Sequence, residues 1–150
     1  MENWAVHATV ACVVERDGCY LMVEERDKAT GEMVFNQPAG HLEDGESLIE
    51  AVHRETLEET GWRIQLRGVI GLSLYRVPTR GNTYFRTTFL ADALDRVTGA
   101  TIDPDIHAVH WLSYEEIRNY SDKLRSPVVL EVIERHRGGL CYPLDLIQNR

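Results

Sequence analysis

Apolar and polar residues alternate along Val6–Glu15, which predicts a β-strand. One face of this strand would carry Ala8, Val10, Cys12 and Val14. A tight-turn pair, Asp17–Gly18, comes next and is followed by the apolar run Cys19–Val23. An Asp-Gly pair between two such runs is typical of a β-hairpin. We therefore expect two antiparallel strands, and we expect the polar segment Glu24–Glu32 to lie outside them as a loop.

The most regular helical pattern lies between Ser47 and Gly61. Ser47 and Glu50 have the spacing of a capping box, in which the hydroxyl and the carboxylate each accept a free backbone amide at a helix start. Glycine readily takes the left-handed conformation that ends a helix, so Gly61 is expected to close it. The helix should begin near Leu48 and span about three and a half turns. Its expected core-facing residues are Leu48, Ile49, Val52 and Leu57.

The rest of the chain alternates strand patterns with helix patterns. Further strands are expected at Val34–Gln37, Ile64–Val77 (as one long strand or two short ones), Tyr84–Leu94 and His107–Leu112. A turn at Pro78–Thr83 and a loop at Val97–Pro104 separate them. Two more helices are expected, one capped by Ser113 and Glu116 and ending at Asn119, the other running from Ser126–Pro127 to near Gly138 with the stripe Val129, Leu130 and Ile133. This order predicts an α/β fold whose mixed sheet is covered on both faces.

Charge and composition limit the partners that the protein can have. The 150 residues suit one domain and carry a formal net charge of −8. An acidic chain argues against binding a nucleic acid polymer or an anionic membrane face, because both favour basic patches. The sequence has no run of transmembrane length and no basic segment followed by an apolar core at its start, so we expect a cytoplasmic protein. Cys12, Cys19 and Cys141 lack close metal-ligand spacing and are expected to be reduced thiols.

Three glutamates of the predicted helix indicate a cation site. Glu55, Glu58 and Glu59 stand at positions i, i+3 and i+4, which places them on one side of the helix. Like charges at this spacing repel, and the last turns of a helix carry the negative end of its macrodipole. A bound cation would offset both effects, and Mg²⁺ prefers a few carboxylates together with water and phosphate oxygens. The alternative is a solvated acidic face with no ligand.

The segment around these glutamates resembles the Nudix hydrolase family. Its signature, G-x5-E-x7-R-E-U-x-E-E-x-G-U, is matched in identity and spacing by Gly40, Glu46, Arg54, Glu55, Glu58, Glu59 and Gly61. Two aliphatic positions of the signature depart from the pattern, with Thr56 at the first and Trp62 at the second. Outside the signature, HATVACVVE, FNQPAGHLE and RSPVVLEVIE…YPLDLI look like the NudJ-type phosphatases within this family.

The resemblance implies a Nudix α/β/α sandwich and a Mg²⁺ cofactor, with Mn²⁺ as an alternative. It implies that the cation is held by the carboxylates of Glu55, Glu58 and Glu59 and by the backbone carbonyl of Ala39. Glu55 or Glu59 would also act as the general base, and the sequence does not decide between them.

Arg54 is implied to hold a catalytic glutamate in place, with Glu46 as its ionic partner. Without the resemblance, an ordinary surface pair with Glu50 or Glu58 would be the preferred interpretation.

A second acidic site is indicated by the loop sequence TIDPDIHAVHW. Many family members place a metal-binding or catalytic acid in this loop, and Asp105 matches that position more closely than Asp103 through its spacing to Trp111. Asp-Pro-Asp is also good turn material, so a purely structural role stays open.

Other candidate groups carry less weight. His41, His107 and His110 lack a tight ligand motif and are left out of the metal site. Arg86 and Arg125 could clamp phosphate, although a solvated surface position is the stronger expectation. A base could stack on an aromatic side chain, but core packing is expected for most of these residues: Tyr20, Phe35, Tyr84, Phe85 and Trp111.

The resulting hypothesis is a Mg²⁺-dependent hydrolase of phosphoanhydrides that acts on a small-molecule diphosphate or nucleotide, as a monomer or homodimer. NudJ-type resemblance implies release of phosphate from nucleoside di- and triphosphates and from the hydroxymethylpyrimidine diphosphate of thiamine synthesis. An ADP-ribose or dinucleotide pyrophosphatase is the alternative, slightly favoured by Pro78, which lies 16 residues beyond the signature. The protein could also be a non-catalytic nucleotide-sensing module, which the loss of a signature glutamate would favour, but none is lost. A plain structural domain with an acidic helix is a further alternative, which an absence of metal-dependent stabilisation would support.

Overall fold

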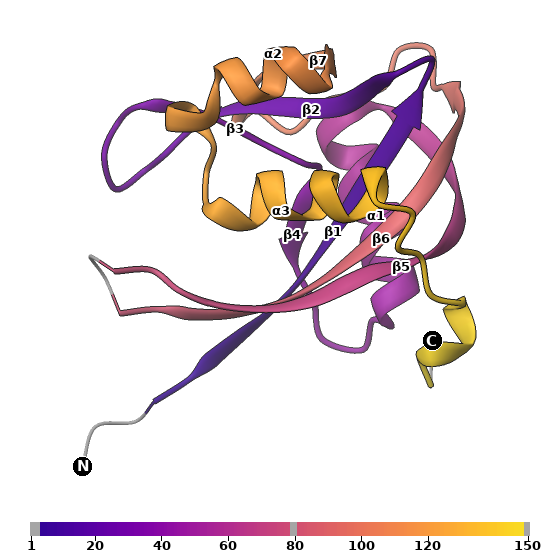
Figure 1. Ribbon diagram of the computed structural model, residues 1–150, viewed down its shortest axis with the longest axis horizontal. Helices are drawn as coiled ribbons and strands as arrows, with labels where there is room; N and C mark the ends of the chain where they lie inside the picture. The colour runs from indigo at the N-terminus through magenta and orange to yellow at the C-terminus, as the bar shows by residue number, and fades with distance from the viewer. Residues whose placement is uncertain (1–3, 79–80, 149–150) are drawn as a thin grey trace.

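The computed structural model describes residues 4–78 and 81–148 (Figure 1). The strands are β1 (Val6–Arg16), β2 (Cys19–Arg26), β3 (Met33–Asn36), β4 (Ala39–His41), β5 (Trp62–Arg76), β6 (Thr83–Arg96) and β7 (Ile106–Ser113). The α-helices are α1 (Leu48–Thr60), α2 (Tyr114–Asn119) and α3 (Pro127–Arg137). Two short 3-10 helices are η1 (Ser121–Lys123) and η2 (Leu144–Leu146).

The strands form a mixed sheet that divides along β1. Its order is β3-β2-β1-β6-β5, with β4 also paired to β1 and β7 to β2. β1 runs parallel to β6, and the other pairs are antiparallel. β1 pairs with β4 over Thr9–Ala11 but meets β2 only at Glu15 and Arg16. The segment that joins β3 to β4 therefore crosses at the division, where the Cys12 amide donates to the Pro38 carbonyl at 3.0 Å.

Helices cover both faces of this sheet, which confirms the α/β/α sandwich. On one face, α1 packs Ala51 and Val52 into a core cluster with β1, β5 and β6. On the other face, α2 and α3 supply Ile117, Val129 and Ile133 to a second cluster. Figure 1 shows α3 lying across the sheet, with the β5 and β6 hairpin extending beneath its start.

The predicted limits of α1 are confirmed. Ser47 Oγ accepts the Glu50 amide at 3.1 Å and Glu50 Oε1 accepts the Ser47 amide at 3.0 Å, so both halves of the capping box are present. Gly61 has φ 76, the left-handed value that ends a helix. The prediction that Leu57 faces the core is wrong, because its side chain is 38% exposed. Thr56 follows Val52 by one helical turn and takes the buried position instead.

β2 is longer than predicted, β5 takes one of its two expected forms, and β4 is an additional strand. β2 continues to Arg26, so the expected loop begins later than predicted; Glu24 is held there by His110 at 3.0 Å, and Glu25 by Arg125 at 3.1 Å. The pattern that began at Ile64 forms one long strand, β5, rather than two short ones, and the short strand β4 was not predicted.

The apolar stripe of α3 also differs from the prediction. Val129 and Ile133 are buried as expected, but Leu130 is only partly buried, and Val128 and Val132 complete the buried face. Within the predicted turn Pro78–Thr83, residues 79 and 80 lie outside the described residues.

Candidate active site

Strand β4, which precedes α1, and the last turns of α1 meet at Ala39 and Gly40. The Ala39 amide donates a hydrogen bond to Glu59 Oε1 at 2.9 Å. A β-carbon on Gly40 would lie only 2.1 to 2.4 Å from the carboxylate atoms of Glu55. The absence of a side chain at Gly40 is therefore what allows the Glu55 carboxylate to occupy this position.

Arg54 organises the glutamates around it. Its Nε donates to Glu46 Oε2 at 2.5 Å, and its Nη1 donates to Glu55 Oε1 at 2.8 Å and to Glu58 Oε2 at 3.2 Å. Its Nη2 donates to the His41 carbonyl at 3.0 Å, which ties α1 to the end of β4. The structure thus gives Arg54 the predicted partner Glu46 together with the helix-surface partner Glu58.

The pKa values of the glutamates in this cluster shift in opposite directions. The hydrogen bond from Arg54 lowers the pKa of Glu46 to about 2. Burial raises the pKa of Glu55, and burial raises the pKa of Glu59 to about 9. The Ala39 amide moderates the shift at Glu59, whereas the negative charges of Glu25, Glu55 and Asp103 add to it. Glu59 is therefore a carboxylate that would gain much from a nearby positive charge.

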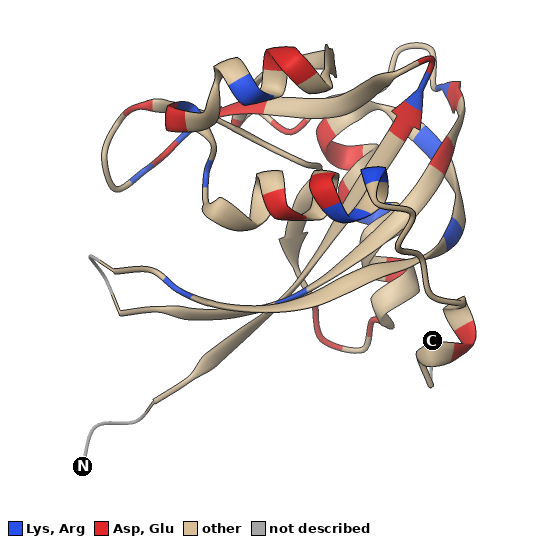
Figure 2. Ribbon diagram, viewed as in Figure 1, with Lys and Arg blue, Asp and Glu red and all other residues tan. Residues whose placement is uncertain are grey.

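The donor set suits a hard divalent cation, because it consists of carboxylate and backbone oxygens. In the described part of the chain, no group of three His, Cys, Asp or Glu side chains is already arranged to hold a metal ion. Arg54 holds Glu55 and Glu58, while Glu59 is bonded to the Ala39 amide. The residues fit a cation once these carboxylates turn toward it, since an added positive charge would favour the ionised form of Glu55 and Glu59. Helix α1 carries Glu50, Glu55, Glu58 and Glu59. Figure 2 shows red, acidic segments on this helix as well as on other elements.

Glu25 is a site residue that the sequence analysis missed. Its side chain is only 15% exposed, and its charge acts on both Glu59 and Arg86. Its place beside α1 depends on how β2 pairs with β3 and β7, and no local pattern in the sequence reports that pairing.

The two acids of the following loop occupy different environments. Asp103 donates its amide to the Glu58 carbonyl at 2.8 Å, and its charge acts on Glu59. Asp105 forms an exposed ion pair with Lys28 at 3.3 Å, and its amide donates to Asp103 Oδ1 at 2.9 Å. The contacts therefore join Asp103 to the glutamates and place the side chain of Asp105 against Lys28, while a catalytic role for Asp105 stays a prediction.

The expectation of a solvated position is wrong for Arg86. Its side chain lies in the interior, where Nη2 donates to Gln37 Oε1 at 2.9 Å and to Asn36 Oδ1 at 3.1 Å. Burial lowers its pKa to about 10, and Glu25 and Glu59 oppose that shift. A short sequence pattern could not predict this burial, because β6 reaches the interior by pairing with β1, about half the chain away.

The two departures from the Nudix signature are both accommodated by packing. Thr56 is fully buried, and its side chain lies against the Cys12 thiol, whose pKa is raised by burial. Trp62 packs edge-on against Trp111 with ring centroids 5.5 Å apart, and the Arg16 guanidinium covers both rings.

Among the described residues, the histidines and cysteines do not form a group that could hold a metal ion. His110 pairs with Glu24 at 3.0 Å, and His41 contacts Tyr84 with ring centroids 6.0 Å apart. Cys12 is buried, Cys19 is half-buried and Cys141 is exposed, and all three are free thiols.

A carboxylate cluster, an arginine that holds it and a glycine that makes room for it lie together on an α/β/α sandwich. A family profile described as "NUDIX domain" matches residues 5–132. The chain belongs to the Nudix family, and it is a hydrolase of phosphorus-containing acid anhydrides. Among curated proteins, it is 40% identical over 141 residues to the protein named Phosphatase NudJ in Escherichia coli (strain K12), covering 94% of this chain and 90% of that protein. Phosphatase NudJ of Shigella flexneri shows the same identity and coverage.

Solved structures agree with this assignment. A Nudix hydrolase from Nitrosomonas europaea has a TM-score of 0.93 and 39% identity, covering 97% of this chain and 98% of that one. The MutT protein from Methanosarcina mazei Go1 has a TM-score of 0.73 at 19% identity, covering 93% of this chain and 99% of that one, and therefore supports the fold alone. None of the helices in the described residues combines the length and apolar character needed to span a bilayer.

Proposed function

We propose that this protein is a Mg²⁺-dependent phosphatase of NudJ type that releases inorganic phosphate from nucleoside di- and triphosphates and from hydroxymethylpyrimidine diphosphate. Mn²⁺ would serve in place of Mg²⁺. The single observation that carries the proposal is that two glutamates of α1 meet β4, where Glu59 accepts the Ala39 amide and Glu55 lies against Gly40. The similarity to proteins named Phosphatase NudJ supports the choice of reaction. The protein would act in the cytoplasm on small molecules, as one domain, in monomeric or homodimeric form.

The chain's own residues divide the work of the reaction. Glu55, Glu58, Glu59 and the Ala39 carbonyl would hold the cation, which when bound neutralises phosphate oxygens and lowers the pKa of an attacking water. Arg54 fixes the directions of Glu55 and Glu58 through its two Nη1 hydrogen bonds.

The general base would come from the same glutamates. Glu59 is one candidate, because a bound cation would favour its ionised, proton-accepting form over the protonated form that burial stabilises. Glu55 is the other candidate, and burial raises its pKa as well. Asp105 or Asp103 would supply a further acid from the loop after β6.

Positioning and charge stabilisation dominate phosphoryl transfer, and both act on the phosphoryl group whatever it is attached to. Such a site would accept several diphosphates and would cut the terminal phosphate.

The test is a substrate panel with separate assays for phosphate and pyrophosphate. A nucleoside triphosphate and the corresponding diphosphate should both yield inorganic phosphate, with little pyrophosphate from the triphosphate. Monophosphate plus pyrophosphate as the first products, or a strict preference for ADP-ribose, would overturn the NudJ-type proposal and leave the family assignment intact.

A further inference from the structure

Strand β5 forms one edge of the sheet, and its first half is protected against pairing with another chain. All three register shifts of its pairing with β6 lie before Leu72. The outer side of Val69 is also occupied, because its amide and its carbonyl both bond to Tyr142 at 2.8 Å. Bulges and covering segments are common means of protecting a sheet edge. The first half of β5 is therefore closed to a further strand.

The second half of β5, residues 71–76, lacks this protection. It pairs with β6 without a register shift, and in the described part of the chain no strand pairs with its outer side. Leu72 and Leu74 are 57% and 67% exposed there. β5 contains no acidic residue, so the negative charge of the chain is not concentrated at this edge. A regular edge with exposed apolar side chains favours pairing with another strand.

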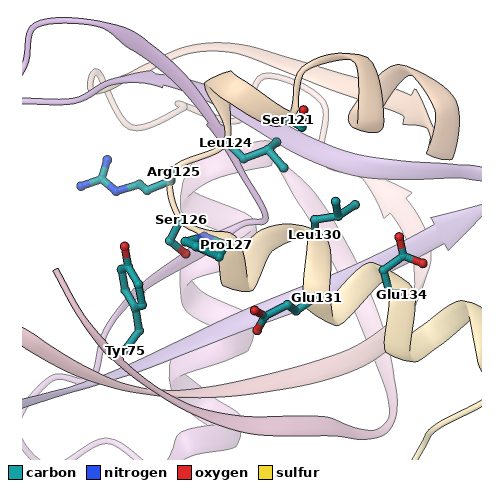
Figure 3. Close-up of a pocket in the computed structure, with 9 residues that line it drawn as sticks. All are labelled: Tyr75, Ser121, Leu124, Arg125, Ser126, Pro127, Leu130, Glu131 and Glu134. Carbon is teal, nitrogen blue, oxygen red and sulfur yellow. The ribbon is translucent and has the colours of Figure 1, made fainter. Parts of the chain in front are cut away.

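A cleft of about 310 Å³ follows the same edge on the face covered by α3. Glu131 and Arg135, one helical turn apart on α3, both line it. Figure 3 shows Tyr75 near Pro127 at the start of α3, with Glu131 further along the helix. At the other end, Arg135 Nε donates to the Ile70 carbonyl at 3.0 Å. The helix therefore runs in the direction opposite to β5, with both charged side chains beside the open edge.

These two charges are complementary to those of a second copy. Glu131 is exposed and, among the described residues, forms no ion pair. Two copies related by a twofold axis present the same patch to each other, so a residue of one copy contacts a different residue of the other. Antiparallel pairing of two β5 edges reverses the direction of α3 in the partner, and Glu131 and Arg135 lie about 6 Å apart along the helix. Glu131 of each copy would then lie beside Arg135 of its partner, which gives two ion pairs at one interface.

The exposed leucines fit the same arrangement. With the pairing centred on Leu72, this side chain would meet Leu72 of the partner, and Leu74 would lie diagonal to it on the same face. The pairing would end before Val69, because Tyr142 already bonds to the outer side of that residue. The interface is therefore confined to residues 70–74 of each strand and to the α3 side chains beside them.

We propose that the outer edge of β5 at residues 70–74 is an interface at which two copies of this chain pair antiparallel, with reciprocal ion pairs between Glu131 and Arg135. This inference does not rest on the proposed function. Because so short a pairing buries a small area, the dimer should be weak and reversible, with a dissociation constant in the micromolar range.

Sedimentation equilibrium between about 1 µM and about 1 mM tests the edge directly. Leu72→Lys should raise the Kd of the dimer about tenfold or more, because two like charges would meet at its centre and lysine protects natural sheet edges. Leu94→Lys is the matched control and should change the Kd less than about twofold, since Leu94 is also 57% exposed but lies on β6, opposite the start of β5. A wild-type protein that stays monomeric, as expected if the edge instead accepts a segment of another protein, would overturn the proposal. So would equal effects of the two lysines.

A charge exchange tests the reciprocal ion pairs. Glu131→Arg and Arg135→Glu should each raise the Kd about tenfold, because each variant brings like charges together in its own dimer. An equimolar mixture of the two variants should dimerise within about threefold of the wild-type Kd, because opposite charges then meet across the interface. A mixture that dimerises no better than the separate variants would overturn the proposal. Arg135 also holds the Ile70 carbonyl, so thermal unfolding is measured for each variant, and the lysine variants decide the proposal if Arg135→Glu does not fold.

Discussion

At the scale of single residues, Gly40 shows how the backbone makes room for chemistry. Any side chain there would displace the Glu55 carboxylate, since a β-carbon would lie 2.1 to 2.4 Å from its atoms. The carboxylate is the end of a flexible side chain, so the protein can fold around the conflict by moving it. The family glycine is thus a requirement of the site more than of the fold.

Gly40→Ala should therefore lower turnover about tenfold or more while changing the thermal midpoint little, because a small displacement of a reacting group is costly. Gly138→Ala is the control, since a β-carbon there would meet its nearest atoms at 3.5 and 3.6 Å. Initial rates and thermal unfolding of both variants decide the point. A large loss of stability with normal turnover per folded molecule would contradict this explanation.

Glu59 gives a pH dependence whose sign follows from its burial. Its pKa is about 9 in the folded protein against an ordinary 4.5, so the folded state binds this proton more tightly than the unfolded state. Without a cation, the stability linked to Glu59 is complete below the ordinary pKa and is lost as the pH rises toward 9. A bound cation would take the place of the proton and oppose that loss.

In excess chelator, the thermal midpoint should fall as the pH rises from about 6 to about 8, and Glu59→Gln should flatten this slope. Added Mg²⁺ should raise the wild-type midpoint more at the higher pH. The same slope in wild type and Glu59→Gln would show that another group controls the pH dependence.

At the scale of elements, the predictions were most accurate for helices and turns whose limits are set by residues within them or at their ends. The limits of α1 follow from Ser47, Glu50 and Gly61, all within the helix or at its ends. The first hairpin follows from Asp17–Gly18, where both residues have positive φ values of 53 and 80. The glutamates, Arg54 and Ala39 of the predicted site could likewise be found from one continuous segment.

Elements that depend on distant partners were not predictable in this way. β4 forms because β1 is available to pair with it, and Glu24 and Glu25 remain in β2 because His110 and Arg125 compensate their charges. Burial of Arg86 depends in turn on amide oxygens supplied by β3 and the following residue.

The loop between β6 and β7 tests whether local spacing or three-dimensional contact identifies the second acid. Asp103→Asn should lower turnover more than Asp105→Asn, because the charge of Asp103 acts on Glu59 and Asp105 pairs with Lys28. Turnover is measured beside the thermal midpoint of each variant. A larger loss of turnover in Asp105→Asn would restore the assignment made from its spacing to Trp111.

At the scale of the whole molecule, the fold brings acidic and basic side chains to the same segment, residues 36–40. The residues Asn36 to Gly40 bring the α1 glutamates together with Arg86, although these groups are far apart in sequence. A chain with net charge −8 can therefore bind an anionic substrate, provided that a cation and the buried Arg86 reverse the local sign. This reversal is the central claim about how the protein works.

The most direct measurement of that claim is the initial rate of phosphate release from a nucleoside diphosphate across a Mg²⁺ titration, in wild type and Glu58→Gln. Glu58 is half exposed at its side chain, so this variant should fold normally. The wild-type rate should rise from near zero in chelator to saturation, and Glu58→Gln should be slower by about a hundredfold or more at every Mg²⁺ concentration. Full activity in excess chelator, or in Glu58→Gln, would contradict the claim.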